Sequence, residues 1–218
     1  IEGKSPNKHN KFTFLIEPLE DGVYKAMLDG EIPSEGVIKS KKVDLFKKFE
    51  KAGMDYDESK NIIQMHSKCV LVDLTKGIQY LNEVMEMVRD AFVEVCEDGP
   101  LSREPCIKMK VKLLDAELHE DPVHRGPGQI MPAVRYGIRQ GMLKANATVL
   151  EPKQVIRIDA PTELMGGVIR EITNRRGQVL DMKEELGVTV ITAKLPVSDM
   201  FGFDATLKSA TSGRGFYS

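Results

Sequence analysis

The alternation of hydrophobic and polar residues along the first half of the chain predicts a mixture of strands and amphipathic helices. Apolar residues at every second position indicate a half-buried strand, and apolar residues three and four apart indicate one face of a helix. The predicted elements are a strand over 11–18, a short helix over 22–30, charged helices over 43–52 and 57–65, an apolar strand over 69–74 and a helix over 77–97. Thr75 is expected to cap the last helix, because its hydroxyl can accept a hydrogen bond from a free backbone N–H.

The next predicted strand, residues 106–118, has the most regular pattern in the sequence. Apolar residues from Ile107 to Leu113 fall on one face, and lysines alternate with them on the other. After Leu113 the apolar positions shift by one residue, which predicts a β-bulge. A polar loop over 120–129 follows, and the apolar stripe after it predicts a helix over 130–145.

The pattern changes after Glu151 and Pro152, which we interpret as a boundary between domains at residues 1–150 and 151–218. Beyond it the predicted elements are strands over 154–160, 178–182 and 188–195, helices over 162–175 and 198–209, and a strand starting at 216. The order β-α-β-β-α-β is that of the ferredoxin-like fold. The sequence therefore predicts an α+β protein whose second domain is ferredoxin-like and truncated in its last strand.

Composition narrows the class of protein. The chain has 218 residues, of which 41% are hydrophobic and 29% charged, as in an average globular protein. The formal net charge of −2 argues against a generally basic nucleic-acid binder but allows a local basic surface. Three cysteines without paired spacing argue against a disulfide framework or a zinc site and favour a reducing, cytoplasmic compartment. No apolar run reaches the ~18 residues of a membrane span.

Two short segments could carry chemistry on residue type alone. Gly3-Lys4-Ser5 matches the end of a phosphate-binding P-loop, but the earlier glycine and the strand that the motif needs do not precede it. His119 and His124 flank a polar loop, and together with Asp121 they could bind a metal ion or act as acid and base. The alternative for these residues is a solvated loop without chemistry.

The same loop has features of an anion-binding site. Arg125 lies beside His124, and the helix that follows would direct free backbone N–H groups towards the loop. Residues 121–144 contain four basic side chains and one acidic one, and the segment 4–11 is also basic. Positive charge at one end of a nearly neutral protein favours a polyanion such as RNA, although either basic segment by itself is typical of a solvated surface.

Three long motifs stand out: SPNKHN at 5–10, VLVDLTKGIQYLNE at 70–83 and DPVHRGPGQ at 121–129. Shorter motifs follow at 166–168, 174–177 and 201–203. In this order, and over essentially the whole chain, they resemble archaeal and eukaryotic elongation factor 2, the GTPase that drives translocation on the ribosome. The long motifs resemble the start, the central strand–helix block and the diphthamide loop of its domain IV, and the shorter ones resemble its domain V.

The resemblance implies that residues 1–150 are domain IV, with a left-handed βαβ fold like that of a ribosomal protein, and that residues 151–218 are most of domain V. It also implies that His124 is converted to diphthamide and then ADP-ribosylated by diphtheria-type toxins, which use NAD. In the family, the tip of domain IV contacts the codon–anticodon region of the small ribosomal subunit, tRNA and mRNA. Its residues here would be Pro6, Asn7, Lys8, His9, His119, Asp121, Val123, Arg125 and Gly126.

The resemblance also limits what these residues are expected to do alone. The G domain, which binds GTP and Mg²⁺ in the family, and domains II and III have no counterpart in the sequence, so we expect no cofactor, no catalytic residue and no enzyme activity. The C-terminal helix of the family is also expected to be missing. Pro127 replaces a glycine of the eukaryotic loop, as in the archaeal form, and should stiffen the turn.

The expected partners are the ribosome, its RNA ligands, the enzymes that make diphthamide and the toxins, with no membrane and with the chain itself a monomer. The alternative is a stand-alone enzyme of related βαβ fold that uses His119, His124 and Asp121 as acid–base or metal-binding residues.

Overall fold

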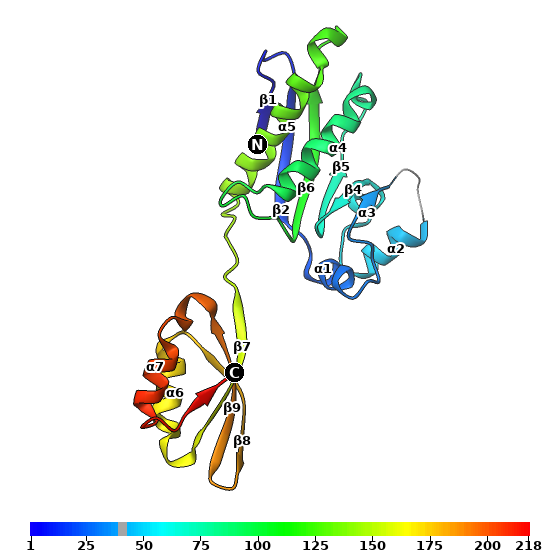
Figure 1. Ribbon diagram of the computed structural model, residues 1–218. Helices are drawn as coiled ribbons and strands as arrows, with labels where there is room; N and C mark the ends of the chain where they lie inside the picture. Colours follow the sequence, from blue (N-terminus) through cyan, green and yellow to red (C-terminus); the bar gives the residue numbers. More distant parts are fainter. Residues whose placement is uncertain (39–42) are drawn as a thin grey trace. The chain divides into compact units, whose positions relative to one another are not determined.

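The computed structural model describes residues 1–38 and 43–218. The described residues form two compact units, Ile1–Val149 and Leu150–Ser218, each with its own sheet (Figure 1). The first unit ends one residue before the boundary that the sequence predicts.

In the first unit, the described residues form a six-stranded sheet in the order β1-β2-β6-β5-β4-β3. The strands are β1 (Glu2–Lys4), β2 (Lys11–Pro18), β3 (Gly36–Val37), β4 (Ile62–His66), β5 (Cys69–Asp73) and β6 (Met109–Glu117). Strands β5 and β6 are parallel and are joined through helix α4 (Leu81–Glu97), whereas the other pairs are antiparallel. The sheet therefore contains the expected βαβ unit, and the left hand of its crossover stays a prediction.

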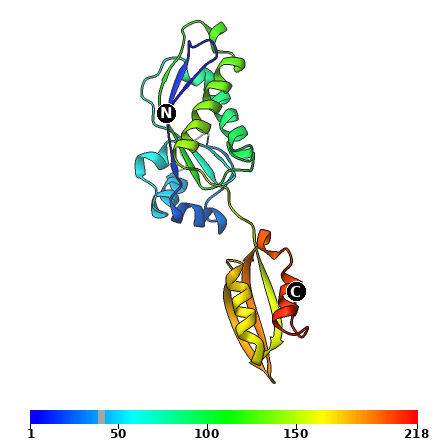
Figure 2. The ribbon, with the colours of Figure 1, turned by 90° about the vertical axis from the view of Figure 1, so that its left-hand side faces the viewer.

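Helices α4 and α5 (Pro127–Lys144) pack side by side and share the core of one face of this sheet (Figure 2). The predicted stripe of α5 is confirmed, because Ile130, Val134, Ile138 and Met142 are all buried. The helix approaches β1 so closely that a Cβ added at Gly3 would lie 2.1 Å from the carbonyl oxygen of Ala133. Gly3 is thus a packing residue in a strand, not part of a phosphate loop.

Helices α1 (Asp21–Leu28) and α2 (Val43–Lys51) contribute to a second core, which includes the β5 residues Val70 and Val72. Helix α3 (Tyr56–Lys60) packs next to α2 and buries Ser59. Lys110 and Lys112 of β6 are also covered, and Lys110 is only 3% exposed. The face of β6 that carries the lysines is therefore an interior surface.

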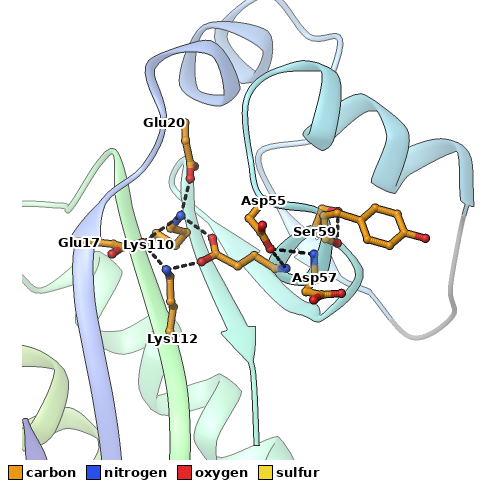
Figure 3. A network of polar contacts seen from close by, with 9 residues as sticks. Glu17, Glu20, Asp55, Asp57, Ser59, Lys110 and Lys112 are labelled. Carbon is orange, nitrogen blue, oxygen red and sulfur yellow. Dashed lines mark hydrogen bonds and ion pairs between the residues drawn. The ribbon is translucent and has the colours of Figure 1, made fainter.

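A network of charges neutralises these lysines (Figure 3). The Nζ atom of Lys110 lies 3.0 Å from Oε1 of Glu17 and 2.6 Å from Oε2 of Glu58, and it also binds Glu20. Lys112 pairs with Glu17 at 2.6 Å and with Glu58. A buried charge is tolerated only where it is paired, and these carboxylates supply the partners. The same contacts join β2 and β6 to α3.

The predicted β-bulge is confirmed. Thr13 pairs with Asp115 and Phe14 with Leu113, so Leu114 is the extra residue of β6. Because Leu114 is inserted, the next buried position after Leu113 is Ala116. This is the one-residue shift of the apolar positions that the sequence shows.

Two predictions for the middle of the first unit are wrong. The helix expected over 57–65 ends at Lys60, because the β-branched pair Ile62 and Ile63 continues as β4 beside β5. The helix expected from residue 77 begins at Leu81. Thr75 does not cap it, because its N–H and hydroxyl both donate to Asp73 Oδ1, at 3.0 and 2.7 Å.

All residues of the second unit are described, and they confirm the ferredoxin-like prediction. The elements are β7 (Lys153–Pro161), α6 (Met165–Asn174), β8 (Gln178–Glu185), β9 (Val188–Pro196), α7 (Phe203–Ala210) and β10 (Phe216–Tyr217). Their antiparallel sheet has the order β10-β7-β9-β8, and both helices contribute to its core. In the described parts of the two units, no helix is long and apolar enough to cross a membrane.

Candidate functional site at one end of the six-stranded sheet

Two loops from distant parts of the sequence meet at one end of the first sheet. The first, residues 5–10, connects β1 to β2, and the second, residues 118–126, connects β6 to α5. They meet because β2 and β6 are antiparallel, so Lys11 at the start of β2 pairs with Glu117 at the end of β6. We call these two loops the tip of the first unit (Figure 1).

Buried side chains of the first loop hold the backbone of the second. Asn10 is fully buried, and its Nδ2 donates to the carbonyl oxygen of His124 at 2.8 Å. Its Oδ1 accepts the N–H of His119 at 3.1 Å, so one amide group bridges both ends of the segment 119–124. Asn7 adds a longer bond to His124 O, at 3.4 Å, and its own N–H donates to Gln129 Oε1 at 3.0 Å.

The rings of His9, His119 and His124 cluster between the loops. Their centroids are 4.5–4.9 Å apart, with His9 stacked on His124 and His119 edge-on to both. Nδ1 of His119 accepts the N–H of Asp121 at 3.0 Å. The carboxylate of Asp121 accepts the N–H of Val123 at 2.9 Å and thereby caps the 3₁₀ turn Pro122–Arg125.

The cluster does not amount to a recognisable metal centre. Within residues 1–38 and 43–218, no group of three His, Cys, Asp or Glu side chains is arranged to hold a metal ion. Asp121, the carboxylate that the enzyme alternative would use, serves as the cap of the turn.

Arg125 corrects the sequence-based expectation. The resemblance places it among the residues of the tip that contact a ligand, but the side chain is buried, with the residue only 4% exposed. Its Nη1 donates to the carbonyl oxygens of His119 and Glu120, the latter at 2.8 Å, and Nη2 pairs with Glu83 of α4. The guanidinium lies 4.2 Å from the ring centroid of Tyr80. Arg125 therefore supports the loop from inside.

The other predicted tip residues are at least partly accessible. Val123 is 81% exposed and is the most prominent apolar side chain of the loop. The exposed members of the predicted set are Pro6, Lys8, His9, Asp121 and Val123, and the half-buried members are Asn7, His119, His124 and Gly126. A ligand at the tip would meet these side chains directly.

The positive charge counted along residues 121–144 is largely neutralised by α4. Arg125 pairs with Glu83, Arg135 pairs with Glu94, and Arg139 pairs with Asp98 at 2.9 Å. These acidic partners were not predicted from the sequence. A signal exists for two of them, because Glu94 and Asp98 are four residues apart, as are Arg135 and Arg139, and such pairs share one face of a helix.

Comparison with known proteins places both units. A family model described as Elongation factor G, domain IV, matches residues 30–146, and one described as Elongation factor G C-terminus matches residues 148–218. Over 218 residues the chain is 49% identical to Elongation factor 2 of Pyrococcus horikoshii, 48% to that of Pyrococcus furiosus and 46% to that of Methanocaldococcus jannaschii. The whole chain is covered in each case, but it spans only 30% of the length of each relative. The chain therefore belongs to the family of elongation factors G and 2, in the region of domain IV and the C-terminal domain.

Proposed function

We propose that the chain provides the part of a translocation factor that contacts the ribosome, with His124 as the residue converted to diphthamide. The tip would contact the codon–anticodon region of the small subunit in the cytoplasm, where tRNA and mRNA move together. GTP hydrolysis would belong to a G domain, which neither of the two matched family models represents. The chain itself would bind RNA and perform no catalysis.

The observation that carries this proposal is the way in which the tip presents His124. Its backbone carbonyl is held by the buried side chain of Asn10, while its ring is half-buried and stacks on the exposed ring of His9. A half-buried ring whose backbone is held in place suits covalent modification and contact with an RNA groove. RNA helices are recognised largely by shape and through their backbone and 2′-hydroxyl groups.

The charge distribution is compatible with RNA binding of modest electrostatic strength. Lys8 is exposed in the first loop, whereas the arginines of residues 121–144 are paired with acidic residues of α4 or of its C-terminal end. Each phosphate neutralised by the protein adds to the salt dependence of binding. The proposal therefore predicts a weak salt dependence for the isolated chain, with specificity supplied by the shape of the tip.

The modification is tested by mass. Protein made in an archaeal host that has the diphthamide pathway should yield a peptide spanning Glu120–Arg135 that is heavier than its sequence, with the added group on His124. Protein made in a bacterial host, which lacks the pathway, is the unmodified control. A peptide of unmodified mass from the archaeal host would contradict the assignment of His124.

The toxin reaction gives a second test. Modified protein should accept labelled ADP-ribose from NAD in the presence of diphtheria toxin, and His124→Ala should abolish the labelling. His66→Ala is the matched control, because His66 lies on β4 and pairs with Glu35 and Glu97, outside the tip. Labelling that survives in His124→Ala would show that another residue is the target.

A further inference from the structure

We propose that Arg125 is a positioning residue, which fixes the orientation of the His124 ring through its attachment to Glu83 and Tyr80 at the start of α4. The inference rests on the proposed function of His124 as a modification site. It assigns to α4 a role in presenting the modified residue, although α4 contributes none of the predicted tip residues.

The guanidinium of Arg125 closes the loop on itself. Nη1 of Arg125 donates to two consecutive carbonyl groups, those of His119 and Glu120, which lie just before the turn that contains His124. Because Arg125 also follows His124 directly in the chain, its side chain folds back and closes the segment 119–125 into a ring. The segment can change shape only if these bonds break.

The same guanidinium is attached to the start of α4. Nη2 of Arg125 pairs with Glu83 in the first turn of the helix, and the guanidinium stacks on the ring of Tyr80 immediately before it. Stacking and a carboxylate partner suit the planar guanidinium better than an ammonium group. A buried cation that lost these partners would be destabilising, which favours this position of the side chain.

Asn10 holds the other side of the segment 119–125. It binds the N–H of His119 and the carbonyl oxygen of His124, while Arg125 binds the carbonyl oxygen of His119. Both backbone polar groups of His119 are thus held by buried side chains from different elements. The stacking of His124 on His9, at 4.8 Å between ring centroids, depends on this two-sided support.

The chain offers a matched control in the pair formed by Arg135 and Glu94. It joins α5 to α4, as the Arg125 pair joins the loop to α4, and it also consists of one arginine and one glutamate. Arg135 has no hydrogen bond to the loop among those found in the described residues, and its side chain is about one-third exposed. Loss of this pair perturbs the packing of the helices without reaching His124.

The experiment compares Arg125→Lys with Arg135→Lys in the full chain. Lysine keeps the positive charge but cannot direct a planar fork at two carbonyl groups and a carboxylate together. The measured quantity is the rate of diphthamide formation on exposure to the modifying enzymes, followed by intact mass. We expect the rate to fall about tenfold or more in Arg125→Lys, since a displacement of 1 Å can cost on the order of 10²-fold. In Arg135→Lys it should stay within about twofold.

A second measurement reports the ring position independently of the modification. Stacking on His9 shifts the NMR signals of the His124 imidazole, and the shift should diminish in Arg125→Lys and persist in Arg135→Lys. If wild-type protein is not modified at all, the proposed function fails, and the NMR comparison alone decides the role of Arg125. Glu83→Gln, which keeps the shape of the partner but removes its charge, serves if Arg125→Lys does not fold, and should show the same changes.

The proposal is overturned if Arg125→Lys matches Arg135→Lys in rate or in the His124 signals. Equal losses in both variants would also overturn it, because they would show a general effect of helix packing.

Discussion

Replacing Lys110 with methionine removes the central cation of the network that joins β2 and β6 to α3, while keeping most of the apolar stem. Three carboxylates, those of Glu17, Glu20 and Glu58, would then share Lys112 as their remaining cation. The charge of the cluster would change from −1, with three acids and two lysines, to −2. Lys110→Met is therefore expected to destabilise the first unit far more than a surface substitution.

The magnitude follows from the burial of the network. Removing one partner of a buried ion pair costs about 3–5 kcal/mol. We expect about 3 kcal/mol, because the side chains of Glu17 and Glu20 are 32% and 25% exposed and can regain water. For a domain of this size, about 2–4 °C in Tm corresponds to 1 kcal/mol, so the unfolding temperature should fall by about 6–12 °C.

The effect should depend on pH in a defined direction. Burial opposes the ionisation of Glu17, but hydrogen bonds from Lys112 and Lys110 outweigh it and hold the pKa of Glu17 below its usual value. A carboxylate with a lowered pKa in the folded state stabilises the fold above its unfolded pKa, and this contribution is lost as pH falls through the folded pKa. The deficit of Lys110→Met should therefore be full near neutral pH and shrink below about pH 4, where unfolded carboxylates become protonated.

The lysines set the upper end of the pH range in which the network stabilises the fold. Burial by itself would lower the pKa of Lys110, but hydrogen bonds to Glu20, Glu58 and Glu17 raise it above its usual value. A lysine with a raised pKa in the folded state contributes fully below its unfolded pKa, about 10.4, and loses the contribution as pH rises through the folded value. The stabilisation by the network should therefore be constant from about pH 5 to pH 9.

Thermal unfolding followed by circular dichroism at pH 7 and pH 3 measures the size of the deficit and its loss in acid. Lys108→Met is the control, because Lys108 pairs with Asp21 at the surface, where the side chains are 39% and 90% exposed. Such a pair contributes less than about 1 kcal/mol. A loss of stability in Lys110→Met no larger than that in Lys108→Met, or a deficit that is the same at both pH values, would refute the role assigned to the network.

Three further outcomes are expected. Gly3→Ala should lower the stability of the first unit by about 1–3 kcal/mol, because its Cβ would overlap the carbonyl oxygen of Ala133. Gly128→Ala is the control, because a Cβ added at Gly128 has no described neighbour within 4 Å, and this variant should unfold at the wild-type temperature or above. Equal changes of stability in the two variants would contradict this account. Val123→Ala should change stability by less than about 0.5 kcal/mol, since a side chain that is 81% exposed has little packing to lose; calorimetry would reveal any larger loss. The purified chain should release no phosphate from GTP above a buffer blank, and turnover that persists through further purification would contradict the assignment of catalysis to a G domain.

The pairing of α4 with α5 changes how the basic residues of the second half of the first unit are understood. Counted along the sequence, they form a positive segment that suggests phosphate binding. In the structure, Arg125, Arg135 and Arg139 each pair with an acidic residue of α4 or of its C-terminal end. The field at the tip therefore comes from fewer charges, so under the proposed function the shape of the two loops would carry more of the RNA recognition.

Much of the fold could be predicted from the sequence because it depends on local periodicity. The limits of β2 match the prediction, and the stripe on α5 and the bulge at Leu114 follow from which side chains must face the core. The ferredoxin-like order of the second unit also follows, since its alternation of strands and helices is complete within residues 153–217. The motifs SPNKHN and DPVHRGPGQ locate the tip loops in the sequence, but they do not predict how the side chains of the two loops are arranged.

Only the tertiary structure decided the features that depend on residues far apart in the chain. Strand β4 exists because β5 pairs with it, although its residues fit a helical pattern as well. Lys110 is buried because Glu20 and Glu58, at separations of 90 and 52 residues, reach it. Arg125 is buried in the tip because Glu83, 42 residues away in the sequence, pairs with it. A local pattern shows which side chains need a partner, but the identity of that partner is set by the packing of the folded chain.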